Sequence, residues 1–427
     1  MPKTPEEIFD FTKVSDACIK CGKCIPVCTI HNVNADEVTS PRGFIDLLGA
    51  YKRGDLELDR TAKDIFESCF LCTNCVDVCP KSLPTDMIIE QVRSDIAQQY
   101  GIAWFKKAFF YLLRHRKTMD LLFKMGYVFQ TCGFKIKKEI ASMEPRFSLP
   151  IIKKDRLLPS MGKTSFLNAN PEYINNGGTR QVAIFIGCLG NYNYTQIGSG
   201  LLRILKHLEI NVFIPKKQLC CGAPAYFTGD FATVDHNAKK NIEYFESFID
   251  EVEAIIVPEA TCSAMLSVDY EHFFHDQPEW LQRATALKRK IFMATEWLEQ
   301  HTQLNALLAS KQRSDLQVTY HDPCHARKMQ GIYEEPRKLI AHNYTLVEMS
   351  DSNACCGFGG VTMQTEKFHF AQAAGRPKAA MIKQTGAQIV SAECSACRMQ
   401  INNAMYEADV TTVFKNPIEL IADILEH

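Results

Sequence analysis

The sequence predicts an α/β protein, in which a helix-rich region of about 100 residues precedes two copies of a unit with a mainly parallel sheet. Three observations lead to this fold class. A run of four cysteines recurs after 51 residues, and a longer segment recurs after about 135 residues. Within the longer repeat, strand-like and helix-like patterns alternate, which is typical of units with a parallel sheet.

The composition is that of an ordinary globular protein, except for its cysteines. The chain has 427 residues, of which 46% are hydrophobic and 23% charged, so we expect two or three domains with real cores. It carries 48 basic and 49 acidic residues, and a net charge of −1 gives no reason to expect nucleic acid as a partner. The exception is the count of 18 cysteines.

The start of the chain, MPKTPEEIFDF, is acidic and polar where a signal peptide needs an apolar stretch. No run of 18 apolar residues occurs, so no membrane-spanning helix is expected. We therefore expect a cytoplasmic protein whose thiols stay reduced. In such a protein, many cysteines indicate metal binding or redox chemistry rather than disulfides.

Two cysteine runs share the spacing C-x₂-C-x₂-C-x₃-C. They are Cys18, Cys21, Cys24 and Cys28, and then Cys69, Cys72, Cys75 and Cys79. This is the spacing of two-cluster bacterial ferredoxins, in which the fourth cysteine of each run binds the other cluster. One 4Fe–4S cubane is therefore expected on Cys18, Cys21, Cys24 and Cys79, and the second on Cys69, Cys72, Cys75 and Cys28. Zinc knuckles are the alternative, which two interleaved quartets make less favourable.

The longer repeat carries cysteines at the ends of strand-like segments. The first copy has Cys188, Cys220, Cys221 and Cys262, and the second has Cys324, Cys355, Cys356, Cys394 and Cys397. Strands are expected within 182–188, 253–262, 317–324 and 387–394, with helices at 200–208 and 367–383. Because ligands of open α/β sheets lie at the carboxyl ends of the strands, the cysteines of each copy should converge.

The two copies differ at one position, where Met265 stands in place of a final cysteine. Five converging thiolates exceed what a cubane needs, so the second copy predicts an unusual iron–sulfur centre. Four thiolates suit a tetrahedral zinc site as well as a cluster. For the first copy, zinc, a cluster and an empty site all remain open.

The segment 101–138 joins the two duplicated regions and is basic and aromatic. Trp104, Phe105, Ala108, Phe109, Leu112 and Leu113 share one helical face, with lysines and arginines around it and Asp120 as the one acid. Such a helix either lies on a membrane surface or docks on protein. Cys132 has no counterpart in either repeat, and we expect it to be a buried bystander.

No convincing flavin or dinucleotide fingerprint is present, and we name no catalytic residue. GSGLLR (198–203) lacks the third glycine of such a fingerprint and does not open directly off a strand. The chain therefore has candidate electron carriers but nothing that could remove a hydride from an organic substrate. We expect no flavin on this chain and a partner that performs that step.

The motifs resemble a known family of iron–sulfur subunits. The resemblance rests on CIKCGKCIPVC, SPRG (40–43), CFLCTNCVDVCP, GCLGNYNYTQIG, LCCGAP, YHDPCHARKMQG, CCGFGG and CSAC. The arrangement is similar to the iron–sulfur subunits of glycolate oxidase and of anaerobic glycerol-3-phosphate dehydrogenase. The CCG module also occurs in heterodisulfide reductase and in atypical succinate dehydrogenases.

The resemblance implies a function and a cofactor set. The chain would carry electrons from a flavoprotein dehydrogenase, acting on a 2-hydroxy acid such as glycolate or lactate or on glycerol 3-phosphate, toward membrane quinone, directly or through an anchor subunit. It further implies a noncubane 4Fe–4S cluster on Cys324, Cys355, Cys356, Cys394 and Cys397, and keeps structural zinc open for the first copy. The alternatives are a catalytic subunit like heterodisulfide reductase, or the iron–sulfur subunit of an atypical succinate dehydrogenase.

The expected organisation has four parts. They are a ferredoxin-like domain at 1–100, an amphipathic helical linker at 101–180, and two tandem Rossmann-like CCG domains at 181–310 and 311–427. The expected location is the cytoplasm, peripheral on the inner face of the membrane.

Overall fold

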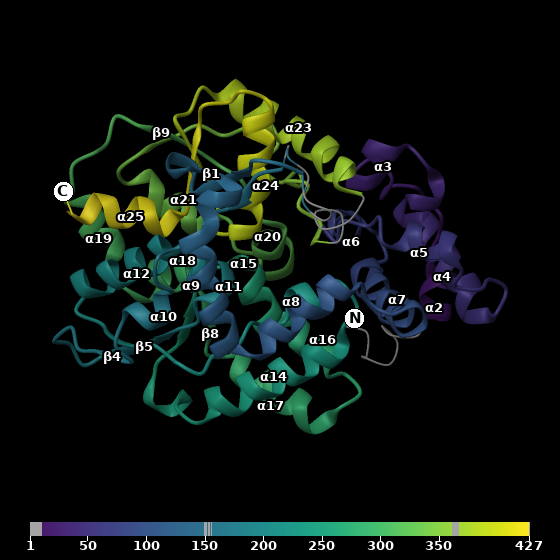
Figure 1. Cartoon of the computed structure of the whole chain (residues 1–427), viewed down its shortest axis with the longest axis horizontal. Coiled ribbons are helices and arrows are strands. Elements are labelled where there is room, and N and C mark those ends of the chain that lie inside the picture. Colours follow the sequence, from purple (N-terminus) through teal and green to yellow (C-terminus); the bar gives the residue numbers. More distant parts are fainter. Residues whose placement is uncertain (1–10, 149–151, 153, 155, 361–366, 427) are drawn as a thin grey trace.

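The computed structural model describes residues 11–148, 152, 154, 156–360 and 367–426. Its N-terminal part is helical and forms one end of the molecule, to the right in Figure 1. The helices are α2 (Phe11–Ala17), α3 (Thr29–Asn34), η1 (Glu37–Thr39), α4 (Pro41–Arg53), α5 (Arg60–Phe66), α6 (Asn74–Asp77) and α7 (Thr85–Tyr100). Helix α4 shows why they begin and end where they do: the Ser40 hydroxyl accepts the Gly43 N–H at 3.0 Å, and Gly54 closes the helix in the left-handed conformation.

The cysteine duplication is repeated in the backbone. Lys20 and Leu71 occupy equivalent positions and have φ of 54° and 52°, while Gly22 and Thr73 have φ of 76° and 57°. A left-handed conformation costs a non-glycine residue about 1–2 kcal/mol. Each run therefore forms the same tight curl, which aims its first three thiols at one site.

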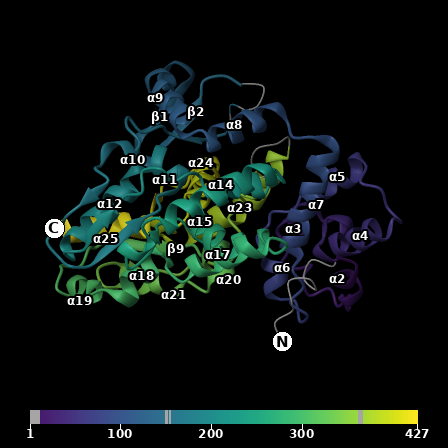
Figure 2. The same cartoon turned by 90° about the horizontal axis from the view of Figure 1, so that it is seen from below.

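The connecting segment consists of two helices and a small antiparallel sheet. Its elements are α8 (Trp104–Arg114), α9 (Arg116–Gly133), β1 (Phe134–Lys137), η2 (Lys138–Ile140), β2 (Ser142–Pro145) and β3 (Leu158–Pro159), with strand order β1-β2-β3. Phe110, Leu113 and Met119 are buried in the core of the first α/β unit, so one face of this segment docks on protein. Helix α9 with β1 and β2 lies at the edge of the molecule in Figure 2.

The outer face of α9 is apolar and exposed. It carries Leu121, Leu122, Met125, Val128 and Phe129. Our expectation that Cys132 is buried was wrong, because Cys132 is exposed on the same helix. None of the described helices is both long and apolar enough to cross a lipid bilayer.

The first α/β unit has five strands, in the order β4-β6-β5-β7-β8. The strands are β4 (Tyr173–Ile174), β5 (Gln181–Ile184), β6 (Asn211–Phe213), β7 (Ile255–Val257) and β8 (Ile291–Met293). All pair in parallel except β4, which is antiparallel to β6. The helical elements are α10 (Phe166–Ala169), α11 (Gly187–Tyr192), α12 (Thr195–His207), α13 (Ala223–Tyr226), α14 (Phe231–Glu246), η3 (Ile249–Glu251), α15 (Ala260–Ala264), the π-helical turn η4 (Met265–Asp269), α16 (Tyr270–Phe273), α17 (Pro278–Lys288), α18 (Ala294–His301) and α19 (Leu304–Ala309).

The second unit has four strands, all parallel, in the order β10-β9-β11-β12. They are β9 (Gln317–Tyr320), β10 (Thr345–Leu346), β11 (Ile389–Ser391) and β12 (Val413–Lys415). Helices α20 (Cys324–Gln330), α21 (Glu334–Ala341), α23 (Phe368–Thr385), α24 (Ser395–Glu407) and α25 (Pro417–Glu426) accompany them. The prediction of an α/β fold with mainly parallel sheets is confirmed.

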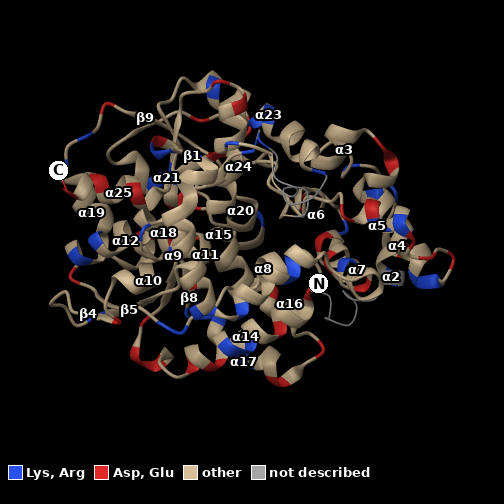
Figure 3. Ribbon diagram, in the orientation of Figure 1, with Lys and Arg blue, Asp and Glu red and all other residues tan. Residues whose placement is uncertain are grey.

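The two units share one hydrophobic core. The C-terminal helix α25 packs on α12 of the first unit, and its Ile418 and Ile421 belong to the same buried cluster as Val182 and Val318, one from each sheet. Basic and acidic residues are interspersed over the ribbon, as the near-zero net charge implies (Figure 3).

Two buried glutamates join the units reciprocally. Glu259 follows β7 and accepts hydrogen bonds from the backbone N–H (2.8 Å) and hydroxyl of Ser395 in the second unit. Glu393 follows β11 and accepts from the N–H (3.2 Å) and hydroxyl of Thr295 in the first. Burial raises the pKa of Glu259 to about 7 and that of Glu393 to about 8. The carboxyl ends of the central strands thereby face one another.

Candidate metal centres

The structure brings the eight cysteines of the N-terminal part together in two groups. One cavity is lined by Cys18, Cys21, Cys24 and Cys79, and a second by Cys28, Cys69, Cys72 and Cys75. Cys75 also borders the first cavity. In each group three thiols come from one curl and the fourth from the other run, which is the crossed arrangement that the spacing predicts.

Thiols of the second group are costly to ionise in the absence of a cation. Burial raises the pKa of Cys69 to about 11, and it also raises the pKa values of Cys28 and Cys75. A thiolate removed from water needs a compensating positive charge, which a metal ion supplies directly. The chemistry and position of these donors therefore fit soft metal ions such as those of iron–sulfur clusters.

Arg93 joins the second run to the first α/β unit. This guanidinium is buried, and it donates to the carbonyl oxygens of Cys69 at 2.7 Å and Phe227 at 3.0 Å. A third partner is the carbonyl of Phe66, at 3.1 Å. One side chain thus fixes the position of Cys69 relative to the first unit.

Lys328 joins the same run to the second α/β unit. Its Nζ donates to the carbonyl oxygens of Cys72 at 3.3 Å and Asn353 at 3.4 Å. The Cys72 thiol itself is a hydrogen-bond partner of Cys355, a cysteine of the five-cysteine group. The second ferredoxin-type group and the five-cysteine group are therefore in direct contact.

The five cysteines of the second unit converge at the carboxyl end of its sheet. Cys324 begins α20, Cys355 and Cys356 lie in the loop after β10, and Cys394 and Cys397 lie at the start of α24. The Cys394 sulfur accepts the Cys397 N–H at 3.3 Å, and the Cys356 thiol has both Cys355 and Cys397 as hydrogen-bond partners.

Gly357 lets the loop after the cysteine pair pass close to α23. It has φ of 86°, and a Cβ there would lie 2.9 Å from the Ala371 carbonyl oxygen. Gly222, after the corresponding pair of the first unit, has φ of 99°. The CCG sequence is thus a turn that needs glycine in both units.

Thiols in the five-cysteine group stabilise one another's thiolates. Hydrogen bonds from Cys355 and Cys397 lower the pKa of Cys356, and the Cys397 thiol lowers the pKa of Cys394 to about 7. Lys378 lies nearby, with its ammonium donating to the Asp351 carbonyl oxygen at 2.8 Å. The group can therefore present ionised sulfur donors near neutral pH.

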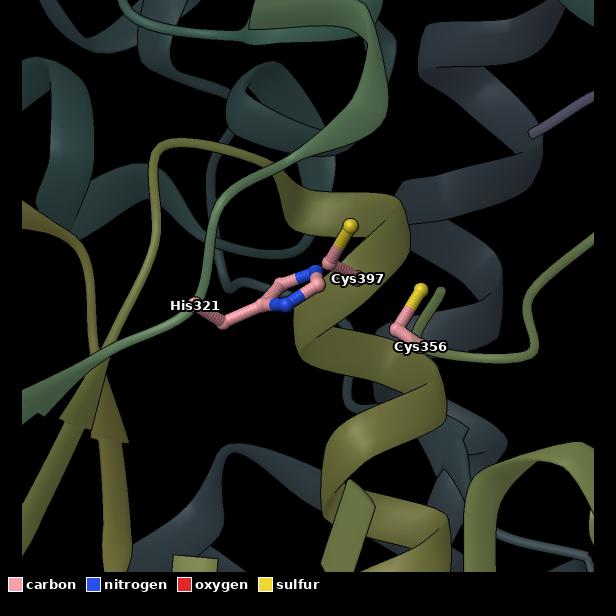
Figure 4. A group of neighbouring side chains, drawn as sticks. All are labelled: His321, Cys356 and Cys397. Carbon is pink, nitrogen blue, oxygen red and sulfur yellow. The ribbon is translucent and has the colours of Figure 1, made fainter. Parts of the chain in front are cut away.

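Sequence reasoning noted His321 but did not name it as a ligand. It follows β9, is 1% exposed, and offers a ring nitrogen that lies with the sulfurs of Cys356 and Cys397 so that all three atoms are within 4.8 Å of one another. Figure 4 shows the imidazole turned toward the two sulfurs, which come from a loop and from α24. Burial and the charge of Lys378 lower the pKa of His321, so the ring is neutral.

The four cysteines of the first unit also converge. Cys188, Cys220 and Cys221 are hydrogen-bonded in series, and the sulfurs of Cys221 and Cys262 are 3.5 Å apart. Gly187 makes this approach possible, because it has φ of 70° and a Cβ there would lie 2.8 Å from the Cys262 sulfur.

The two units place their last cysteines differently. Cys262 comes three residues after Glu259 and lies inside α15, whereas Cys394 directly follows Glu393 and caps α24. A small cavity beside Cys188 and Cys220 is lined by residues of α8 and α9, including Leu113, Arg116 and Met119. The connecting segment therefore covers the four-cysteine group.

A cluster of buried acids was not foreseen from the sequence. Burial raises the pKa values of Asp86 and Glu90 on α7 and of Asp269 in η4, and Glu90 is hydrogen-bonded to Tyr226. These residues lie far apart in the sequence, so no local spacing could have revealed them. They place protonatable groups between α7 and the first unit.

Comparison with known families matches most of these cysteines to two kinds of domain. Residues 14–83 match a 4Fe-4S dicluster domain, and residues 182–267 and 318–402 match a cysteine-rich domain named CCG. The dicluster domain supports two 4Fe–4S clusters, and the two cysteine-rich domains suggest further metal centres.

Individual relatives are redox proteins. The chain is 28% identical to the probable glycolate oxidase iron–sulfur subunit of Bacillus subtilis, with 90% of this chain and 87% of the relative covered. It is 31% identical to lactate utilization protein A of an Exiguobacterium species, with 53% and 90% covered. It is 28% identical to a fumarate reductase (CoM/CoB) subunit of Methanothermobacter marburgensis, with 98% and 73% covered.

A solved structure of a hypothetical protein from Helicobacter pylori is similar in fold. The TM-score is 0.51 at 11% identity, with 99% of this chain and 76% of that chain covered. At this identity the likeness concerns the fold alone.

Proposed function

This chain belongs to the family of iron–sulfur subunits that join a 4Fe–4S dicluster domain to two cysteine-rich domains, and from this we propose that it carries electrons from a flavoprotein dehydrogenase toward membrane quinone. The dehydrogenase would oxidise a 2-hydroxy acid, glycolate or lactate, or else glycerol 3-phosphate. The proposed parts are the dicluster domain at 1–100, the linker at 101–180 and the CCG domains at 181–310 and 311–427.

The observation that carries the proposal is the contact between Cys72 and Cys355. Cys72 belongs to the second ferredoxin-type group, and Cys355 to the five-cysteine group. When bound, iron–sulfur clusters supply one-electron carriers at both groups. Lys328 holds the two backbones together, and the Thr29 hydroxyl lies 3.3 Å from the Cys72 sulfur. The groups are thus arranged in series, with the group that contains the exposed Cys21 outermost.

We propose different contents for the two CCG domains. Five converging thiols, two of them with lowered pKa, suit a noncubane 4Fe–4S cluster on Cys324, Cys355, Cys356, Cys394 and Cys397. The four-cysteine group suits a single zinc ion, because the 3.5 Å between the sulfurs of Cys221 and Cys262 resembles the edge of about 3.8 Å in a tetrahedron with Zn–S bonds of about 2.3 Å. An iron–sulfur cluster on Cys188, Cys220, Cys221 and Cys262 is the alternative, and metal analysis separates the two.

The exposed apolar face of α9 supports a position on the cytoplasmic side of the membrane. Leu121, Met125 and Val128 follow helical spacing, and Lys117 and Lys124 are exposed on the same helix. Apolar side chains flanked by lysines favour the interface of anionic lipids. Quinone, which dissolves in the acyl layer, would then be within reach of the protein or of an anchor subunit.

The decisive experiment is isolation of the chain with its partners. We expect a flavin-containing subunit to co-purify and the iron–sulfur centres to be reduced when its substrate is added. Lys328→Ala should leave reduction of the dicluster domain intact and slow reduction of the CCG centre, because it loosens the contact at Cys72. A colourless, zinc-rich protein without iron would overturn the proposal.

A second candidate function is disulfide chemistry at the five-cysteine group. A cavity of about 400 Å³ lies between the N-terminal part and the second unit, beside Cys355, and is bordered by Lys328 and Lys378. The similarity to the fumarate reductase (CoM/CoB) relative points the same way. Reduction of an anionic disulfide by the isolated protein with a chemical electron donor, without any flavoprotein, would favour this candidate.

A further inference from the structure

We propose that His321 is a nitrogen ligand of the metal centre in the second CCG domain, binding through Nε2 next to Cys356 and Cys397. The inference rests on the proposed function, since it concerns the centre held by the five cysteines. It adds a sixth donor to a site for which sequence reasoning named only sulfur.

The hydrogen bond of the other ring nitrogen fixes which nitrogen is free. Nδ1 lies 3.2 Å from the backbone carbonyl oxygen of Ser352. A carbonyl oxygen can only accept, so the proton of the neutral ring is on Nδ1 and Nε2 carries a lone pair. Metal-binding histidines characteristically donate their other N–H to a carbonyl or carboxylate, which orients the ring and fixes its tautomer.

Nε2 is buried and has no hydrogen-bond partner among the described residues. A buried acceptor left without a partner costs about 1–3 kcal/mol. Nearby donors are already engaged: the Lys378 ammonium donates to the carbonyls of Asp351 and Ser352, and the Lys328 ammonium donates to those of Cys72 and Asn353. A metal ion would satisfy this nitrogen.

The two sulfurs complete the geometric argument. A ring nitrogen of His321 and the sulfurs of Cys356 and Cys397 all lie within 4.8 Å of one another, and they come from three different segments of the chain. In Figure 4 the imidazole edge is directed into the space beside both sulfurs. Donor atoms around one metal ion are about 3.5–4 Å apart when their bonds are about 2.0–2.3 Å long, so small rotations of these side chains bring all three onto one ion.

His325 provides a matched control. It lies one residue after Cys324, with Nδ1 3.3 Å from the Cys324 sulfur, and it is close enough to the centre to be affected by any general disturbance. Its ring lies beside that of Phe227, with centroids 5.4 Å apart, and it is not part of the group that His321 forms with Cys356 and Cys397.

The test uses the full chain with its clusters, labelled with ¹⁵N only in histidine, and electron–nuclear double resonance of the reduced centre. We expect the hyperfine coupling of a directly bonded ¹⁵N in wild-type protein. It should persist in His325→Ala and disappear in His321→Ala at unchanged iron content. All ferredoxin-type ligands are cysteines, so the dicluster domain contributes no such coupling.

Each outcome decides the question. Wild-type protein with iron beyond two cubanes but no bonded histidine nitrogen overturns the ligand role and leaves the proposed function intact. Iron sufficient for two cubanes only overturns the cluster and the ligand role together. If His321→Ala does not fold, coupling in labelled wild type that survives His325→Ala still supports His321, whereas its loss in His325→Ala overturns the assignment.

Discussion

The exposed face of α9 gives a quantitative prediction of membrane binding. The perturbation is the triple variant Leu121→Ser, Val128→Ser and Phe129→Ser, at side chains that are 59%, 62% and 62% exposed. Since these residues already face solvent, their replacement should leave the fold unchanged. Only contacts that the face makes outside the chain should be lost.

The magnitude follows from the exposed fractions. Complete burial of such a side chain contributes about 1.5–3 kcal/mol, so the exposed part of each contributes about 1–2 kcal/mol on insertion into lipid. For three side chains the loss is about 4 kcal/mol, which corresponds to roughly a thousandfold weaker partitioning. Lysines near an anionic surface each add about 1 kcal/mol, so binding should also weaken as salt is added.

The assay is co-sedimentation with vesicles that contain either neutral lipid alone or neutral and anionic lipid. Wild-type protein should bind the anionic vesicles and the triple variant should not. Leu316→Ser is the matched control, because Leu316 is 42% exposed but lies before β9, far from α9 in the sequence. Equal binding of wild type and triple variant would refute the membrane assignment and favour a protein partner on this face.

Three further predictions concern the metal centres and the buried acids. Cys75→Ala should remove one cubane signal from the electron paramagnetic resonance spectrum, while Cys132→Ala, at an exposed cysteine outside both repeats, should remove none; a lost signal in the latter would contradict the ligand assignment. Gly187→Ala should lower the metal content of the first CCG domain by up to one zinc per chain, because its Cβ would lie 2.8 Å from the Cys262 sulfur, and mass spectrometry of the metals would show iron unchanged. Burial raises the pKa of Asp269 from 3.8 to about 7, so the unfolded carboxyl ionises first and stability should fall as pH rises from about 4 to about 7; Asp269→Asn should reduce that fall in urea unfolding followed by circular dichroism, and an unchanged pH profile would argue against it.

Much of the site could be predicted because its ligands lie in short local motifs. The C-x₂-C-x₂-C spacing fixes a curl of the backbone, and the same left-handed residues at positions 20, 22, 71 and 73 repeat with it. The strands ending near Cys188 and Cys324 could be found because buried parallel strands are short apolar runs. Their exact ends could not, since β5 stops at Ile184 and the turn that follows depends on Gly187.

Other features depend on residues that meet only in the folded chain. The role of Cys132 was misjudged because an amphipathic helix can turn either face to solvent, and packing of α8 and α9 on the first unit decides which. His321 stands three residues before Cys324, a position that by itself is compatible with a purely structural histidine. Its free nitrogen is visible only beside Cys356 and Cys397, which come from other segments.

The sequence by itself determined which residues can bind metal, how they are grouped by repeat, and that the two copies differ at Met265. These are matters of donor chemistry and local spacing, and they survive any arrangement of the parts. The tertiary structure decided the order of the groups, through the contact of Cys72 with Cys355, because long-range packing sets distances between segments more than 250 residues apart. It likewise decided which face of α9 remains open and which nitrogen of His321 is free.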